Sequence, residues 1–104
     1  MPQIAIDDIR SAAERIKGSV QRTPCPHSVP LSMATGCEVY CKLEFLQRTG
    51  SFKERGARNA LILLDDARKC RGVITASAGN HALGLAYHAR LLAVPMRHTA
   101  RARP

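Results

Sequence analysis

Twice along this chain, an alternating apolar and polar segment is followed by a short loop and then by a helical pattern. The first unit predicts a strand at residues 39–44 and a helix at 51–64. The second unit predicts a strand at 72–76 and a helix at 81–92. Consecutive strand–loop–helix units are typical of a parallel sheet with flanking helices. The expected fold class is therefore α/β.

An amphipathic helix and a proline-rich segment precede the first unit. Apolar residues recur at three- and four-residue spacing between Ile9 and Val20, and Asp7 or Asp8 can cap this helix. Prolines recur within residues 22–36, which predicts loop or extended chain with one short helical turn. We therefore expect the sheet to start only after this segment.

The end of the sequence does not continue the pattern. Residues 92–95 approach a third strand, but residues 96–104 follow neither the strand period nor the helix period. We therefore predict one structural unit over residues 1–95 and an irregular basic tail over 96–104, disordered from Met96 onward.

Composition and charge exclude several classes of partner. The chain has 104 residues, which is room for one small domain, and a net charge of +8. No apolar run is long enough to cross a membrane and no secretory signal pattern is present, so we expect a cytoplasmic location and no membrane contact. The excess positive charge lies in residues 67–104. Neither interleaved aromatics nor a helix-turn-helix or zinc-finger spacing accompanies it, so we expect no specific nucleic-acid partner.

The four cysteines predict no metal site. No Cys-x-x-Cys pair is present, and Cys37 and Cys41 bracket a predicted strand, which would place both on one face of a sheet. Cys25 and His27 are close enough in sequence to form a metal or nucleophile pair. We favour the alternative of buried or half-buried thiols in a reducing compartment.

Lys53 is a candidate nucleophile. The spacing of Ser51 and Glu54 predicts a capping box, which would place Lys53 in the first turn of a helix. There the helix dipole, two nearby arginines and the apolar Phe52 all disfavour a charged ammonium, and a neutral amine can form a Schiff base. An ordinary solvated lysine is the alternative.

The loop at residues 77–80 is a candidate anion site. It joins the end of the second predicted strand to the start of a helix, which is where open α/β sheets bind ligands. Backbone N–H groups and the side chains of Ser77 and Asn80 can hold a carboxylate or phosphate, and Gly79 permits close approach. The alternative is that Ser77 and Asn80 only cap the helix.

Four ordered motifs resemble a known enzyme family. They are Arg22-Thr23-Pro24, Lys42-Leu43-Glu44, the run Gly-Ser-Phe-Lys-Glu-Arg-Gly-Ala at 50–57 and the run Ala-Ser-Ala-Gly-Asn-His-Ala at 76–82. Together they resemble the N-terminal part of threonine dehydratase (threonine ammonia-lyase), over residues 4–95. This group, which includes serine racemase and serine dehydratase, has the tryptophan synthase β-like fold. The resemblance implies part of that fold and pyridoxal 5′-phosphate as cofactor.

The resemblance also implies roles for individual residues. Lys53 matches the lysine that binds the cofactor as a Schiff base and acts as acid and base. Phe52 matches the residue packed against the cofactor ring, and Asn80 matches the residue that hydrogen-bonds the ring hydroxyl. The loop that holds the substrate carboxylate is matched by Ser77, Gly79, Asn80 and His81.

The activity implied by the resemblance is dehydration of a hydroxy amino acid. The expected substrate is the small molecule L-threonine, or L-serine, which is converted to a 2-oxo acid and ammonia, as in isoleucine biosynthesis. Ala78 stands where enzymes like serine racemase carry a serine, which favours elimination over racemisation. The full-length form is expected to be a homo-oligomer.

Two parts of the family's site are not found in this sequence, namely the glycine-rich phosphate loop and the partner of the pyridine nitrogen. No glycine follows Gly84. We therefore expect an N-terminal fragment, from a truncated gene or a frameshift after Pro95, that is inactive alone, loosely folded and prone to associate. The alternative is a non-catalytic remnant that binds anions or a partner through its basic C-terminal third.

Overall fold

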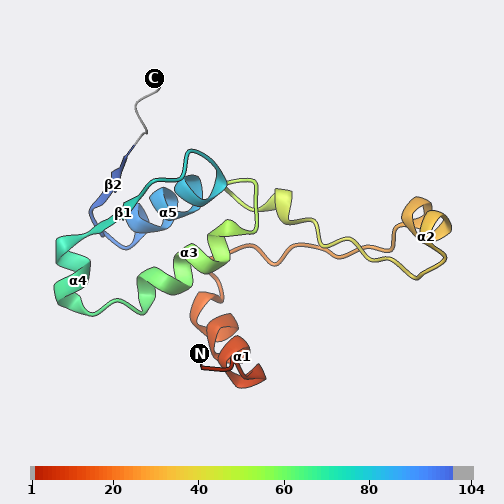
Figure 1. Cartoon of the computed structure of the whole chain (residues 1–104), viewed down its shortest axis with the longest axis horizontal. Helices are drawn as coiled ribbons and strands as arrows, with labels where there is room; N and C mark the ends of the chain where they lie inside the picture. Colours follow the sequence, from red (N-terminus) through yellow and green to blue (C-terminus); the bar gives the residue numbers. More distant parts are fainter. Residues whose placement is uncertain (1, 100–104) are drawn as a thin grey trace.

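The computed structural model describes residues 2–99, which form a helix pair beside a small sheet and a long extended arm (Figure 1). The predicted α/β class is confirmed. The elements in chain order are α1 Ile6–Ile16, α2 Val29–Thr35, the short 3₁₀ helix η1 Glu44–Leu46, α3 Lys53–Ile62, α4 Asp66–Arg71, β1 Val73–Thr75, α5 Asn80–Leu91 and β2 Met96–His98.

The sheet has two parallel strands, β1 and β2, joined through α5. The register pairs Val73 with Met96 and Thr75 with His98. The expectation of disorder from Met96 onward is therefore wrong for β2. The backbone of β2 forms hydrogen bonds with β1 that do not depend on its side-chain pattern. The three residues of β2 are also too few to show the alternation of a strand in the sequence. Residues 100–104 of the predicted tail lie outside the described residues.

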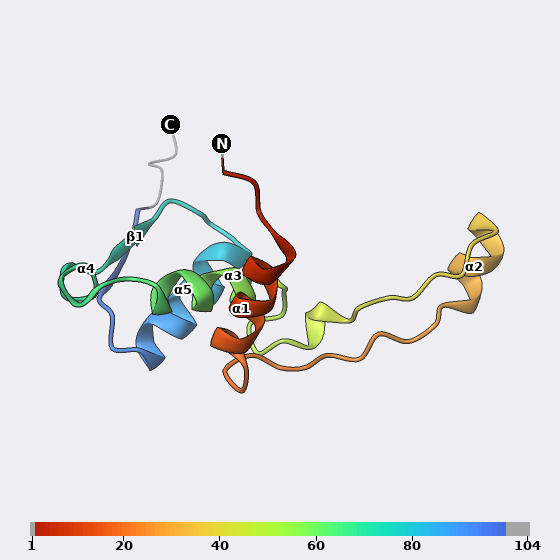
Figure 2. The same ribbon diagram turned by 90° about the horizontal axis from the view of Figure 1, so that it is seen from below.

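Helices α3 and α5 pack against each other and form the core (Figure 2). Each helix contributes two apolar residues at four-residue spacing, which puts them on one face. Gly84 lies at the contact, because a Cβ atom there would lie 3.1–3.3 Å from backbone atoms of Lys53 and Glu54. The helices therefore approach to backbone contact near the start of α3. The core cluster consists of Ala57, Leu61, Leu85, Ala89 and Val94.

The arm consists of two extended segments that run antiparallel and are joined at the tip by α2 (Figures 1 and 2). The prediction of a sheet strand at 39–44 is wrong, because this segment pairs with residues 24–28 and not with β1. Pro24 and Pro26 have no N–H group and cannot return the second hydrogen bond of each antiparallel pair, so no regular strand forms. The bonds that do form are Leu43 N–H to Pro24 C=O at 3.0 Å, Cys41 N–H to Pro26 C=O at 2.9 Å and Ser28 N–H to Val39 C=O at 2.8 Å.

The first helix starts earlier than its acidic residues suggest. Its first residue is Ile6, and Asp8 lies within the first turn, where the carboxylate accepts a hydrogen bond from the N–H of Ala5 at 2.8 Å. Asp8 therefore stabilises the helix start from inside the helix and does not precede it as the cap.

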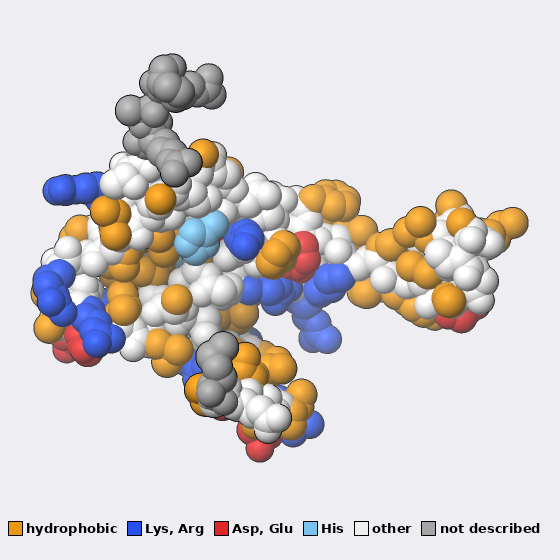
Figure 3. Space-filling model, in the orientation of Figure 1, with side chains coloured by type: hydrophobic (Ala, Val, Ile, Leu, Met, Phe, Trp, Pro, Cys, Tyr) orange, Lys and Arg blue, Asp and Glu red, His pale blue; other side chains and the backbone are white. Residues whose placement is uncertain are grey.

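The described chain is elongated. Its radius of gyration is 16.8 Å, against about 13 Å for a compact domain of this length. Large apolar side chains are exposed on α1 and over the tip of the arm (Figure 3). Within residues 2–99, no helix is long and apolar enough to cross a membrane.

Candidate functional site

The two segments predicted to carry chemistry lie at the same end of the helix pair (Figure 1). Lys53 is the first residue of α3 and Asn80 is the first residue of α5. Gly84, one turn after Asn80, approaches the peptide between Lys53 and Glu54. The structure therefore brings the candidate nucleophile and the candidate anion loop to neighbouring helix N-termini.

The amine of Lys53 is accessible. The side chain is exposed, and Nζ lies 5.3 Å from the ring centroid of Phe52, which is itself 59% exposed. The apolar burial expected around this lysine is absent from the described residues. An exposed amine beside an exposed aromatic ring presents both a nucleophile and a flat apolar surface to a ligand.

The predicted capping box at the start of α3 is wrong. The hydroxyl of Ser51 accepts a weak hydrogen bond from Lys53 N–H at 3.3 Å, but the Glu54 carboxylate does not turn back to Ser51. It accepts from the N–H of Thr49 at 2.8 Å and is fully buried against His88 of α5. Residue spacing cannot reveal this arrangement, since the His88 side chain against which Glu54 is buried lies on another helix.

The loop before α5 leaves the helix start open. The hydroxyl of Ser77 accepts from Gly79 N–H at 3.2 Å, and Gly79 is the N-cap of α5 with no side chain capping it. Neither Ser77 nor Asn80 therefore caps α5 with its side chain, so the alternative that they only cap the helix is wrong. Asn80 and His81 are exposed. The first turn of α5 thus presents backbone N–H groups and a positive dipole end to an anion.

Sequence reasoning missed His98, which holds the anion loop. Its Nε2 atom lies 2.6 Å from the carbonyl oxygen of Ser77, so the ring donates a hydrogen bond to the loop. The N–H of Thr99 donates to the carbonyl of Thr75 at 2.9 Å and extends the contact between the strands. Both residues lie in the segment predicted to be irregular, and nothing in its pattern marks them.

A polar network that ends on α3 was also missed, although three of the four motifs supply it. The Glu44 carboxylate accepts two hydrogen bonds from Arg55, at 2.8 and 2.9 Å, and one from the Thr23 hydroxyl at 2.5 Å. The Arg55 guanidinium, aided by Thr23 and Gln47 and opposed by burial, lowers the pKa of Glu44 to about 2. Buried Gln47 bonds to the backbone of Gln21 in both directions at 2.9 Å. The network therefore ties the arm to the first turn of α3.

Among residues 2–99, no group of three or more metal-ligating side chains includes the cysteines. The ring of His27 lies 3.0 Å from the Ser32 hydroxyl and 3.2 Å from the Glu38 carboxylate, within the arm. Cys37 and Cys41 do not share a sheet face, because neither lies in a strand. The expectation of buried or half-buried thiols holds only for Cys41, since three thiols are exposed: Cys25, Cys37 and Cys70.

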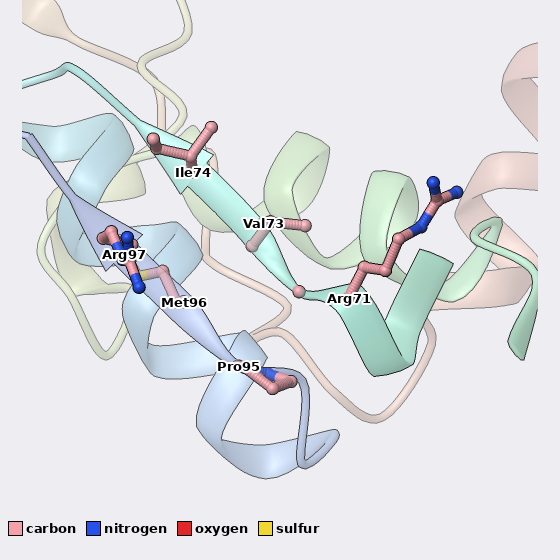
Figure 4. Close-up of a pocket in the computed structure, with 7 residues that line it drawn as sticks. Arg71, Val73, Ile74, Pro95, Met96 and Arg97 are labelled. Carbon is pink, nitrogen blue, oxygen red and sulfur yellow. The ribbon is translucent and has the colours of Figure 1, made fainter. Parts of the chain in front are cut away.

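A hollow of about 470 Å³ lies along β1 and β2, away from the predicted site (Figure 4). None of the predicted site residues lines it. The lining residues are Arg71, Gly72, Val73, Ile74, Pro95, Met96 and Arg97.

Known proteins of one family are similar to this chain. A family model described as "Pyridoxal-phosphate dependent enzyme" matches residues 16–100. The chain is 52% identical to an L-threo-3-hydroxyaspartate ammonia-lyase from Pseudomonas sp over 88 residues, which is 85% of this chain and 28% of that protein. It is 47% identical to an L-threonine ammonia-lyase from Thermotoga maritima over 88% of this chain and 23% of that protein.

A solved structure agrees with these matches. The structure of maize serine racemase superposes with a TM-score of 0.83 at 41% identity, over 93% of this chain and 31% of that one. The chain spans about a quarter of the length of the curated relatives named above. Because the family model covers most of the chain and the fold agrees, the chain belongs to the family of pyridoxal-phosphate-dependent enzymes.

Proposed function

We propose that this chain carries the lysine-bearing part of a dehydratase site that converts a β-hydroxy amino acid to a 2-oxo acid and ammonia. The observation that carries the proposal is that Lys53, whose side chain is exposed, begins α3 where α3 packs against the first turns of α5, and that the N-terminus of α5 is uncapped. The names of two relatives, an L-threo-3-hydroxyaspartate ammonia-lyase and an L-threonine ammonia-lyase, support this reaction class. We propose L-threonine or L-serine as the substrate, on the strength of the motif at residues 76–82.

The described residues fit the family's cofactor. An exposed amine, an exposed aromatic ring and an exposed amide side chain match its aldehyde, its ring and its ring hydroxyl. We assign Lys53 as the covalent anchor, Phe52 as the residue against the ring and Asn80 as the hydrogen-bond partner of the hydroxyl. When bound, pyridoxal phosphate supplies an electron sink for charge that develops on the substrate.

The chain's own residues bind the substrate and move a proton. The loop formed by Ser77, Gly79, Asn80 and His81 offers N–H groups at a positive helix end, which suits the substrate carboxylate. Once the substrate's amino group has displaced it from the cofactor, the freed Lys53 amine would take the proton from the substrate α-carbon as a general base. Ala78 has no hydroxyl and cannot return a proton from the opposite face, which favours loss of the β-hydroxyl over racemisation.

Reductive labelling tests this proposal. We expect that borohydride added to the chain with pyridoxal phosphate fixes the cofactor to Lys53, and that mass spectrometry of peptides locates it there. Lys53→Ala removes the label, whereas Lys17→Ala, at an exposed lysine after α1, retains it. Equal label on the Lys53→Ala chain would show that Lys53 is not the anchor.

The second candidate function is anion binding without catalysis, through the basic C-terminal third. Arg71 and Arg97 are both among the residues that line the hollow beside the sheet, and their positive charge favours an anion nearby. Retention on a polyanion column that falls with salt, together with no 2-oxo acid formed from threonine, would support this function over the first.

A further inference from the structure

Two ionisable side chains are completely buried between α3 and α5. Glu54 and His88 both have 0% exposure, and Glu54 Oε2 lies 3.6 Å from His88 Nε2. Within the described residues, neither of these two atoms has a hydrogen-bond partner. The separation exceeds a hydrogen bond by a few tenths of an ångström, so a small shift of either side chain joins them.

Glu54 links three parts of the chain that surround Lys53. Its second oxygen accepts from the N–H of Thr49 at 2.8 Å, in the turn before α3. Its backbone lies against Gly84 of α5, and its side chain faces His88, one turn further along α5. Lys53 lies between this turn and Glu54. The orientation of the first turn of α3 therefore depends on what holds Glu54.

The surroundings of His88 favour a neutral ring. Burial is the main cause that lowers the pKa of His88, and Arg58 of α3 and Arg48 of the preceding loop act in the same direction. The Glu54 carboxylate opposes them. Tyr87 packs edge-on at 5.0 Å between ring centroids. A neutral ring that carries its proton on Nε2 can donate to the Glu54 carboxylate and satisfy these two atoms, while His88 Nδ1 also has no hydrogen-bond partner within the described residues.

Stability alone does not account for such a pair. Leucine and alanine fill the rest of this helix contact, and well-packed apolar residues in place of a buried ionic pair are often as stable or more so. What the pair could add is a directional contact, since a hydrogen bond between the two side chains would fix their orientation where apolar packing permits sliding. The residue next to Glu54 whose orientation would then be fixed is Lys53.

We propose that Glu54 and His88 are positioning residues that fix the first turn of α3, and with it Lys53, relative to the N-terminus of α5. The consequence for cofactor attachment rests on the proposed function, whereas the contact itself does not. The neutral His88 ring donates from Nε2 to Glu54, and Glu54 in turn accepts from Thr49.

The first test needs no substitution. In the ¹⁵N-labelled full chain, we expect the ring nitrogens of His88 to show the neutral form with the proton on Nε2 between about pH 7 and 8. A proton on Nδ1, or a ring that is charged over this range, would overturn the proposal. This measurement decides the question even where a variant does not fold.

The second test compares three variants of the full chain. His88→Leu removes the donor, His88→Gln keeps an N–H near the position of Nε2, and Leu61→Val weakens the same helix contact without touching the pair. We expect His88→Leu to speed hydrogen exchange at the Thr49 amide by about tenfold or more beyond Leu61→Val. It should also slow cofactor labelling of Lys53 several-fold, and His88→Gln should restore both.

The outcomes separate this proposal from the proposed function. Equal Thr49 exchange in His88→Leu and Leu61→Val, or no recovery in His88→Gln, overturns the positioning role. If the parent chain takes no label at Lys53, the proposed function fails. The hydrogen exchange of the Thr49 amide and the proton position on His88 then still test the positioning role of Glu54 and His88, since neither measurement needs the cofactor.

Discussion

At the scale of single residues, the side chains around Lys53 differ in how far sequence could predict them. Lys53 was predicted in the first turn of a helix and Asn80 at the end of the loop before one, and they are the first residues of α3 and α5. Glu54 was predicted to cap its own helix and instead faces another. A local rule holds where the partner is local, whereas Glu44, Arg55 and His88 act across long sequence separations that no pattern encodes.

The ion pair of Glu44 makes stability depend on pH. The pKa of Glu44 is lowered to about 2 in the folded chain, against about 4.3 in an unfolded one. A lowered carboxyl pKa stabilises the fold above the unfolded value, and this contribution is lost as pH falls from about 5 towards 2. Because Arg55 is about one-third exposed, we expect a contribution of about 1–3 kcal/mol at neutral pH.

Urea unfolding of the parent and of Glu44→Gln measures this contribution. We expect Glu44→Gln to lower the free energy of unfolding at neutral pH, and the difference between the two chains to shrink at about pH 3. A difference that stays constant over this range would mean that Glu44 is not paired as described.

At the scale of elements, the helix pair is predictable and the sheet is not. The helix patterns at 51–64 and 81–92 correspond to α3 and α5, because each carries enough apolar residues on one face to show its period. The strand predicted at 72–76 corresponds to β1. The segment at 39–44 has the alternating apolar and polar residues of a strand, but it pairs with a segment that contains Pro24 and Pro26. Strand β2 is too short for its alternation to show in the sequence. Pairing partners, not the alternation itself, decide which extended segments become strands.

The contact between α3 and α5 predicts opposite effects for two helix glycines. A Cβ atom at Gly84 would lie 3.1–3.3 Å from backbone atoms, whereas Gly56 of α3 has nothing within 4 Å. Displacing the backbone of Lys53 and Glu54 would disrupt the start of α3, so we expect Gly84→Ala to destabilise the chain by about 1–3 kcal/mol. Gly56→Ala should stabilise it by about 0.5–1 kcal/mol, since alanine favours helix.

Thermal or urea unfolding of both variants measures these two changes in the free energy of unfolding. The Gly56→Ala chain is the matched control, because it makes the same chemical change in a helix without a close neighbour. A Gly84→Ala chain that is as stable as Gly56→Ala would show that the two helices are further apart than described.

At the scale of the whole molecule, exposed apolar surface dominates the expected behaviour. The accessible surface is 7961 Å², against about 5,800 Å² for a compact protein of this mass. The exposed apolar residues include Ile6 and Ile9 on α1 and Leu31 and Met33 on α2. Such surface favours association between chains.

We therefore expect the purified chain to self-associate. Sedimentation velocity should show a mass that rises with protein concentration, and heating should give a broad transition with a small unfolding enthalpy. A monomer at all concentrations with a sharp, cooperative transition would contradict this expectation. The matched variant Leu31→Ser and Met33→Ser, at the tip of the arm, should reduce association while leaving the helix-pair core unchanged.

The prolines of the arm have one further consequence. Pro24 and Pro26 leave their antiparallel pairs with a single hydrogen bond each, and Val39 N–H donates to the Ser32 hydroxyl instead of to Ser28, so the arm has about half the cross-strand bonds of an ordinary hairpin. Its two segments bury few side chains and do not contribute to the helix-pair core. The arm can therefore melt on its own while α3 and α5 stay folded, as a separate cooperative unit of low stability. In limited proteolysis, a protease should therefore cleave the backbone near α2 long before it cleaves α3 or α5. The fragment that contains α3 and α5 should persist after the arm has been cut.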